Sequence, residues 1–120
     1  MPHYTDHLIT LVIPVKDEAK EVVADMVFKA QAHGWRVLVV DDGSKVPCTL
    51  ANIRFETSRG YGAAIKAGVR ATQTEFVATM DGDGQHTAWD VKRLEDFLVY
   101  FKPDMVIGDR RLKEQGVRLW

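Results

Sequence analysis

Short, almost continuously apolar segments alternate along the chain with longer segments of helical periodicity. Residues 8–13 (LITLVI) and 35–40 (WRVLVV) are rich in β-branched residues, as expected of strands buried on both faces of a sheet. Residues 18–33 place apolar side chains at helical spacing between them. The same patterns predict further strands and helices at 53–56, 60–72, 76–80, 90–101 and 104–107. Strands joined by helical crossovers pair in parallel, so this order predicts an α/β fold: a mostly parallel sheet with flanking helices.

Composition and charge narrow the class of protein. A chain of 120 residues suffices for one compact domain, so we expect residues 1–120 to form one domain with a basic, irregular tail at 109–120. The formal net charge of −1 argues against nucleic-acid binding. The single cysteine, Cys48, excludes an internal disulfide and a multi-cysteine zinc site. The apolar run 8–15 is too short for a transmembrane segment and follows no Lys or Arg. We therefore expect a cytoplasmic protein, with a peripheral association with the membrane left open.

Polar clusters follow four of the predicted strands. In parallel α/β folds, ligands bind at the carboxyl ends of the strands, so clusters at successive strand ends favour a common binding site. The four clusters are Lys16-Asp17-Glu18, Asp41-Asp42, Asp81-Gly82-Asp83 and Asp109-Arg110-Arg111.

The stretch FVATMDGDGQH, residues 76–86, carries the most specific cluster. Asp81 and Asp83 would repel each other unless a cation lay between them, and Gln85 adds a neutral oxygen at the next alternate position. Such hard oxygen ligands suit Mg²⁺ or Mn²⁺, and the cation would bridge a diphosphate. The alternative is a solvated Asp/Gly turn. An EF-hand is excluded, because its sixth and twelfth positions would be His86 and Lys92.

The first two strand ends offer groups that suit a nucleoside. A carboxylate at Asp41 or Asp42 would accept from the N–H edge of a base or from ribose hydroxyls; the alternative is an Asx-turn. Glu18 would meet a ribose or supply negative charge to a helix N-terminus. Pro14 and Val15 would offer backbone and shape to a base, or simply end the strand.

Two further segments suit a phosphate group. The segment Arg59-Gly60-Tyr61-Gly62 opens a helix, where Arg59 and the close approach allowed by Gly62 favour an anion such as the nucleotide phosphates. It is not the dinucleotide-binding fingerprint, since Ile65 occupies the position of the third glycine, and it is not a P-loop. Arg110 and Arg111 would pair with phosphate oxygens or form a solvated basic tail.

Taken in order, five segments resemble the motif series of inverting family-2 glycosyltransferases with the GT-A fold. They are LVIPVKDE, VLVVDDGS, SRGYGAAIKAG, FVATMDGDGQH and MVIGDRR, and they span Leu8 to Arg111. The resemblance is closest to the polyprenyl-phosphate (dolichol-phosphate) mannose or glucose synthase branch. It implies the Rossmann-like, nucleotide-binding half of a GT-A fold.

The resemblance implies a role for each residue that matches a motif. The nucleotide pocket would be lined by Pro14, Val15, Glu18, Asp41, Asp42 and Asp81. The metal and diphosphate would be held by Asp81, Asp83 and Gln85, with Asp83 and Arg110 as the catalytic residues. Arg110 would lie against the diphosphate or an acceptor phosphate. The cofactor implied is Mg²⁺ or Mn²⁺.

The chain also departs from the family pattern. Asp17 replaces the usual Asn before the Glu, and Thr87 replaces the usual Pro after Gln-His. Family members are longer, so we expect this chain to comprise the nucleotide-binding half and to end where acceptor binding would begin. No general base is evident, and Glu114 is the only carboxylate in the last eleven residues. This favours an acceptor that is already anionic, such as a lipid phosphate, although the base could lie in a segment that the chain lacks.

The implied reaction is metal-dependent transfer of a sugar, with inversion, from a GDP- or UDP-linked donor to a hydroxyl or polyprenyl-phosphate acceptor. One alternative is a non-catalytic nucleotide-sugar-binding module: a truncated, degenerate or regulatory domain, or one half of a homo-oligomer. Another is a haloacid-dehalogenase-like phosphatase, which needs its DxD motif on the first strand and not on the fourth.

Overall fold

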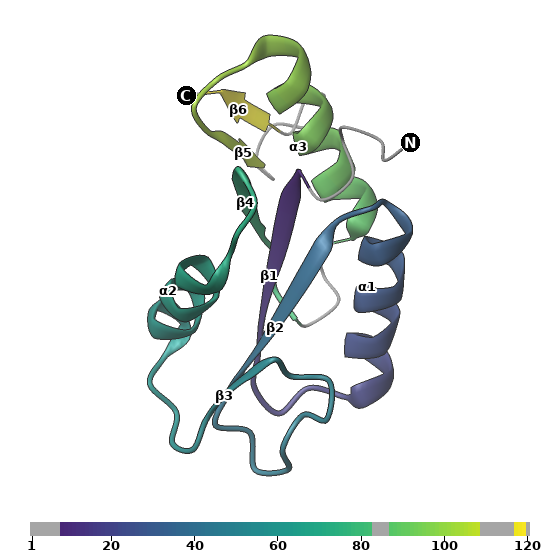
Figure 1. Cartoon of the computed structure of the whole chain (residues 1–120). Coiled ribbons are helices and arrows are strands. Elements are labelled where there is room, and N and C mark those ends of the chain that lie inside the picture. Colours follow the sequence, from purple (N-terminus) through teal and green to yellow (C-terminus); the bar gives the residue numbers. More distant parts are fainter. Residues whose placement is uncertain (1–7, 83–86, 109–116, 120) are drawn as a thin grey trace. The chain divides into compact units, whose positions relative to one another are not determined.

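The chain forms two compact units, residues 1–86 and 87–120, each with its own β-sheet (Figure 1). The structure is a computed structural model, and it describes residues 8–82, 87–108 and 117–119. The first unit contains a parallel sheet with helices on both faces, and the second contains one helix and an antiparallel strand pair. The predicted fold class, a mostly parallel sheet with flanking helices, is therefore confirmed.

The sheet of the first unit has four parallel strands in the order β3-β2-β1-β4. Along the chain its elements are β1 (Ile9–Val15), α1 (Lys20–Ala32), β2 (Arg36–Asp42), β3 (Ile53–Phe55), α2 (Tyr61–Ala71) and β4 (Phe76–Thr79). Strand β1 lies inside the sheet and every one of its residues is buried, as its continuous apolar sequence predicts. Strand β4 lies at the edge, and its side chains alternate between half-buried and exposed.

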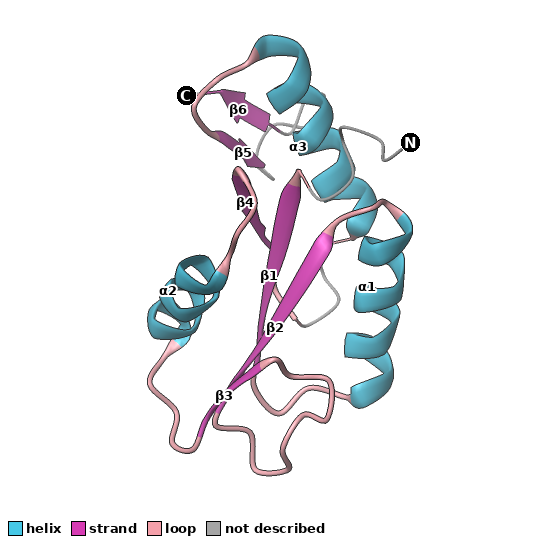
Figure 2. Ribbon diagram, in the orientation of Figure 1, coloured by secondary structure: helices cyan, strands magenta, loops and turns pink. Residues whose placement is uncertain are grey.

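The two helices cover opposite faces of this sheet (Figure 2). Helix α1 buries Val23, Met26 and Ala30, three of the apolar positions that gave the segment its helical period. Helix α2 packs on β1 and β2, where Ala64 joins Val12 and other buried residues in one apolar cluster. Right-handed crossovers require this arrangement, because the chain moves one way from β1 to β2 and the other way from β3 to β4.

The strand order places a topological switch point between β1 and β4. The chain leaves β1 for β2 and β3 on one side and returns through α2 to pair β4 on the other side. Open α/β sheets bind ligands outside the carboxyl ends of the strands at such a point. Here those ends carry residues 16–18 and 81–82.

The second unit begins with α3 (Ala88–Phe101), two residues before the start expected from periodicity. Thr87 is the cause, because its hydroxyl accepts from the Asp90 N–H at 3.2 Å while the Asp90 carboxylate accepts from the Thr87 N–H at 3.0 Å. This reciprocal capping box satisfies two backbone donors at the start of the helix.

Two expectations about the C-terminal segment are wrong. Strand β5 (Val106–Gly108), expected as a fifth strand of the parallel sheet, pairs antiparallel with β6 (Val117–Leu119). Residues 117–119 are therefore a strand and not part of an irregular tail. A three-residue strand carries too little periodicity to predict its partner strand, because the partner is determined by contacts between distant parts of the chain. Arg110 and Arg111 lie outside the described residues.

Two glycines of α2 provide a stability test. A Cβ added at Gly68 would lie 2.3 Å from Cγ1 of the fully buried Val12, whereas one added at Gly62 meets no atom within 4 Å. We expect Gly68→Ala to lower the free energy of unfolding by about 1 kcal/mol, because overpacking outweighs the gain in helix propensity. Gly62→Ala, the matched control, should raise it by up to about 1 kcal/mol. Urea unfolding of both variants checks the pair, and equal effects would contradict the packing explanation.

Candidate functional site

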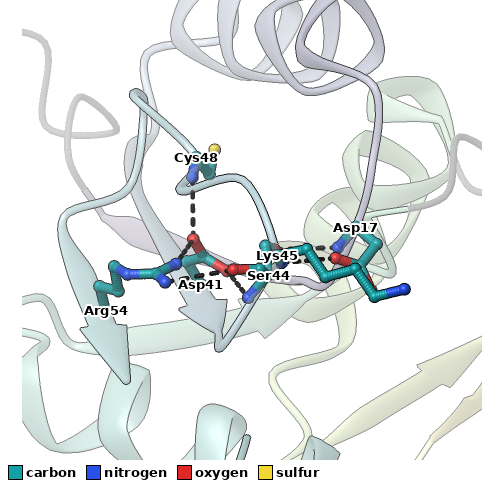
Figure 3. Close-up of polar contacts among 6 residues, drawn as sticks. All are labelled: Asp17, Asp41, Ser44, Lys45, Cys48 and Arg54. Atoms are coloured by element: carbon teal, nitrogen blue, oxygen red, sulfur yellow. Dashed lines mark hydrogen bonds and ion pairs between the residues drawn. The ribbon is translucent and has the colours of Figure 1, made fainter. Parts of the chain in front are cut away.

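A buried carboxylate, that of Asp41, organises the carboxyl end of β2 (Figure 3). Asp41 has no exposed surface. One of its oxygens accepts from the Ser44 N–H at 2.9 Å, and the other accepts from the Cys48 N–H at 2.8 Å and from the Arg54 guanidinium. A buried charge is stable only when it is paired and hydrogen bonded, and these three donors meet that requirement. They also fix the loop between β2 and β3.

Hydrogen bonding determines the charge state of Asp41. Burial by itself would raise the pKa of the carboxyl, but the hydrogen bonds from Cys48, Ser44 and Arg54 outweigh burial and lower the pKa below its ordinary value. The group is therefore a carboxylate at neutral pH, and its negative charge is matched by Arg54.

Asp42, the next residue, holds a different segment. Its carboxylate accepts from the Arg59 N–H at 2.6 Å, the Gly60 N–H at 3.1 Å and the Ser58 hydroxyl at 2.9 Å. Burial would raise the pKa of Asp42, but these bonds and the nearby charge of Lys16 lower it. The chain entering α2 is thus held against the end of β2.

The loop after β1 is bonded to the loop after β2. The Asp17 N–H donates to the Ser44 hydroxyl at 2.9 Å, and the Lys45 N–H donates to the Asp17 carboxylate at 2.8 Å. Asp17 adopts a left-handed backbone conformation with φ 54°. In Figure 3, Asp17 therefore joins the same polar network as Asp41 and Ser44.

Asp81 is positioned from two directions at the end of β4. The backbone before it is held by β1, since the Met80 N–H donates to the Val12 carbonyl at 3.2 Å. The backbone after it passes close to the end of β1, since a Cβ at Gly82 would lie 2.7 Å from the Pro14 carbonyl oxygen. Its carboxylate accepts from the Tyr61 hydroxyl at 2.9 Å. Burial and this carboxylate both raise the pKa of Tyr61, so the hydroxyl keeps its proton at neutral pH.

Sequence reasoning missed Tyr61. The residue lies in the first turn of α2, and its side chain is more than half exposed. A signal was present in the sequence, because a tyrosine between two glycines at a helix start carries a donor near the predicted anion site.

The predicted site residues within the described part of the chain surround the carboxyl edge of the sheet. Pro14 and Val15 are buried, Glu18 is exposed after β1, and Arg59 and Gly62 are exposed around the start of α2. The Arg59 guanidinium also lies 4.5 Å from the centre of the Phe55 ring. Contact of these residues with a nucleotide stays a prediction, as it does for Asp41, Asp42 and Asp81. Three predicted residues lie outside the described part: Asp83, Gln85 and Arg110.

Among residues 8–82, 87–108 and 117–119, no group of three or more His, Cys, Asp or Glu side chains is arranged to hold a metal ion. In those same ranges no helix is both long and apolar enough to cross a bilayer.

The first unit is a Rossmann-like domain with a switch point between β1 and β4, where open α/β sheets generally bind their ligands. Comparison with known families agrees: the model for glycosyl transferase family 2 matches residues 10–120. The chain belongs to this family, as its motif series indicates.

Two of the curated relatives are named for a dodecaprenyl-phosphate or dolichyl-phosphate substrate. It is 30% identical to the dodecaprenyl-phosphate galacturonate synthase of Rhizobium johnstonii, over 92% of this chain and 38% of that protein. It is 36% identical to an uncharacterised glycosyltransferase of Mycobacterium bovis, over 86% of this chain and 49% of that protein. It is 25% identical to the UDP-N-acetylglucosamine–dolichyl-phosphate N-acetylglucosaminyltransferase of Methanococcus voltae, over 88% of this chain and 53% of that protein. The chain thus spans about half or less of the length of these relatives.

The Asp41 network predicts a pH-dependent contribution to stability. We expect Asp41→Asn to lower the free energy of unfolding by about 3 kcal/mol at neutral pH, because Arg54 loses its charged partner and one backbone donor loses its acceptor. The folded-state pKa lies below the ordinary 3.8, so the carboxylate stabilises the fold above that pH and the stabilisation disappears as pH falls through the folded-state pKa. Urea unfolding from neutral to acid pH should therefore show the free energies of unfolding of wild type and Asp41→Asn converging as the pH falls.

The control is Asp25→Asn, which removes the ion pair between Asp25 and Lys29. The Lys29 side chain is 60% exposed and the Asp25 side chain is 57% exposed. This exposed pair should change stability by less than about 1 kcal/mol. A constant difference between wild type and Asp41→Asn down to acid pH would contradict the assignment of a charged, hydrogen-bonded Asp41.

Proposed function

We propose that the chain forms the nucleotide-sugar-binding part of a metal-dependent glycosyltransferase that inverts the anomeric carbon and uses a polyprenyl-phosphate acceptor. One observation carries the proposal: the family match over residues 10–120 coincides with a parallel sheet whose switch point is flanked by the matching motifs. The acceptor class is supported by the names of two relatives, a dodecaprenyl-phosphate synthase and a dolichyl-phosphate transferase.

The two acids at the end of β2, Asp41 and Asp42, have different roles in this proposal. Asp41 has no exposed surface and its oxygens already accept three hydrogen bonds, so we assign it to shaping the pocket through the β2–β3 loop. Asp42 also accepts three hydrogen bonds, but it is 5% exposed and lies beside the start of α2, and we assign it to the nucleoside. Glu18 and the backbone of Pro14 and Val15 complete this part of the pocket.

The donor set proposed for the metal fits a hard divalent cation. It comprises the carboxylates of Asp81 and Asp83 and the amide oxygen of Gln85, and Asp81 is partly exposed at the strand end. Mg²⁺ or Mn²⁺ held there would supply positive charge that stabilises the departing nucleoside diphosphate. Arg59, at the start of α2, and Arg110 would add cationic donors for the phosphates. Tyr61 would keep the Asp81 carboxylate in one orientation.

The acceptor chemistry follows from charge. An acceptor hydroxyl needs a base to remove its proton, whereas a phosphate oxygen is already anionic at neutral pH. A lipid phosphate would therefore attack the anomeric carbon without a general base from the chain. The leaving diphosphate would depart on the opposite side, which gives inversion.

Nucleotide binding tests the proposal directly. We expect calorimetry to show that the chain binds either UDP or GDP, and that binding depends on Mn²⁺ or Mg²⁺. Asp83→Ala should abolish detectable binding, because it removes one of two carboxylates from the metal. Failure of wild type to bind either nucleotide with either metal would overturn the proposal. Binding without transfer to a polyprenyl phosphate would instead support a non-catalytic nucleotide-sugar-binding module.

Tyr61 provides a second test, at the metal. Tyr61→Phe should weaken Mn²⁺ binding by about tenfold, measured by electron paramagnetic resonance of free Mn²⁺, because the Asp81 carboxylate loses the donor that orients it. Tyr100→Phe is the matched control, since it makes the same chemical change at an exposed position of α3. Equal Mn²⁺ affinity in both variants would exclude a role for the Tyr61 hydroxyl.

A further inference from the structure

Asp17 links two loops that are far apart in the sequence. Its N–H donates to the Ser44 hydroxyl at 2.9 Å and its carboxylate accepts from the Lys45 N–H at 2.8 Å, so the residue acts as donor and acceptor to adjacent residues (Figure 3). We call this pair of bonds the Asp17 clamp. It joins the loop after β1 to the loop after β2.

The clamp is anchored in the core. Ser44 is only 4% exposed, and its own N–H donates to the fully buried Asp41 carboxylate at 2.9 Å. Its carbonyl oxygen accepts from the Arg54 guanidinium at 3.1 Å. Ser44 is therefore held on its backbone by the buried ion pair and presents its hydroxyl to Asp17.

The backbone of Asp17 is consistent with a dedicated role. Its φ of 54° lies in the left-handed region, which Gly, Asn and Asp tolerate better than other residues. This conformation turns the chain so that the N–H and the carboxylate of Asp17 both meet the β2–β3 loop. Such a conformation persists where surrounding bonds hold it, and here two bonds do.

The residues on either side of Asp17 are the ones that the clamp places. Lys16 and Glu18 are exposed, and the Lys16 ammonium donates to the Ser58 hydroxyl at 3.2 Å. That hydroxyl in turn donates to Asp42. The loop after β1 is therefore linked through Ser58 to Asp42 at the end of β2. The Asp17 clamp fixes the backbone from which Lys16 and Glu18 project.

We propose that Asp17 is a positioning residue: through Ser44 and Lys45 it holds the β1 loop in the arrangement that receives the nucleoside. This inference rests on the proposed function. Binding then requires no ordering of the loop, and a preorganised loop raises affinity by that saving. The chemistry requires an acceptor oxygen and a left-handed backbone at position 17, and it does not require a negative charge.

Four substitutions separate these requirements. Asp17→Asn keeps both the acceptor and the backbone preference, whereas Asp17→Gly keeps the backbone preference alone. Asp17→Ala keeps neither, and Ser44→Ala removes the acceptor for the Asp17 N–H. We expect Asp17→Gly, Asp17→Ala and Ser44→Ala to weaken Mn²⁺-dependent binding of UDP or GDP by about tenfold. Asp17→Asn should bind as wild type does.

Calorimetry of UDP and GDP with Mn²⁺ is the measurement, and amide hydrogen exchange at Lys45 reports whether the clamp is closed. Protection of the Lys45 N–H should be lost in Asp17→Gly and kept in Asp17→Asn. Unchanged nucleotide affinity in Asp17→Gly and Ser44→Ala would overturn the positioning role and leave the proposed function intact. No nucleotide binding by wild type would overturn both. Weak binding in Asp17→Asn despite a protected Lys45 would overturn the role of the clamp by assigning the effect to charge.

Discussion

The buried charge of Asp41 is the constraint on which the carboxyl edge of the sheet depends. A carboxylate without exposed surface costs several kcal/mol to desolvate unless donors surround it. Its donors come from Ser44, Cys48 and Arg54, which lie on the irregular segment between β2 and β3 and on β3 itself. The loop can leave this arrangement only by exposing or unpairing the charge. A segment with little regular structure of its own is thereby held in one conformation.

Asp42 fixes the segment that follows β3 in the same way. Successive residues of a strand point to opposite faces, so Asp41 and Asp42 reach different segments. Asp41 binds the chain that precedes and enters β3, and Asp42 binds the chain that leaves β3 and enters α2. Together with Asp17, the two acids connect every loop at the carboxyl edge of β1, β2 and β3. The hydrogen bonds at this edge are therefore a network built around these three carboxylates, each of which has donors.

Much of the fold could be predicted because its signals are local. Continuous apolar strands and helical periodicity gave the order of the first unit, and the end of β2 gave the position of its acids. The partners of those acids could not be read in this way, since Asp42 bonds to residues 58–60, which approach only in the fold. The pairing of β5 with β6 was not predicted for the same reason, because the two strands meet only in the fold. The left-handed backbone conformation of Asp17 was also not predicted. Aspartate tolerates this conformation, but the reason for it lies in the hydrogen bonds to Ser44 and Lys45, which are distant in the sequence.

The arrangement also explains why a glycine follows the aspartate at Asp42-Gly43 and at Asp81-Gly82. Gly43 has a φ of +70° and a Cβ there would lie 2.5 Å from the Ser58 nitrogen, so the chain after Asp42 can pass only without a side chain. A Cβ at Gly82 would lie 2.7 Å from the Pro14 carbonyl oxygen at the end of β1, so the chain beside Asp81 also passes closely only without a side chain. Glycine thus allows the loops to approach, and the carboxylates then bond the backbone donors that the approach brings within reach. Under the proposed function, binding energy would not be consumed in ordering the loops after β1 and β2, because their own hydrogen bonds already join them.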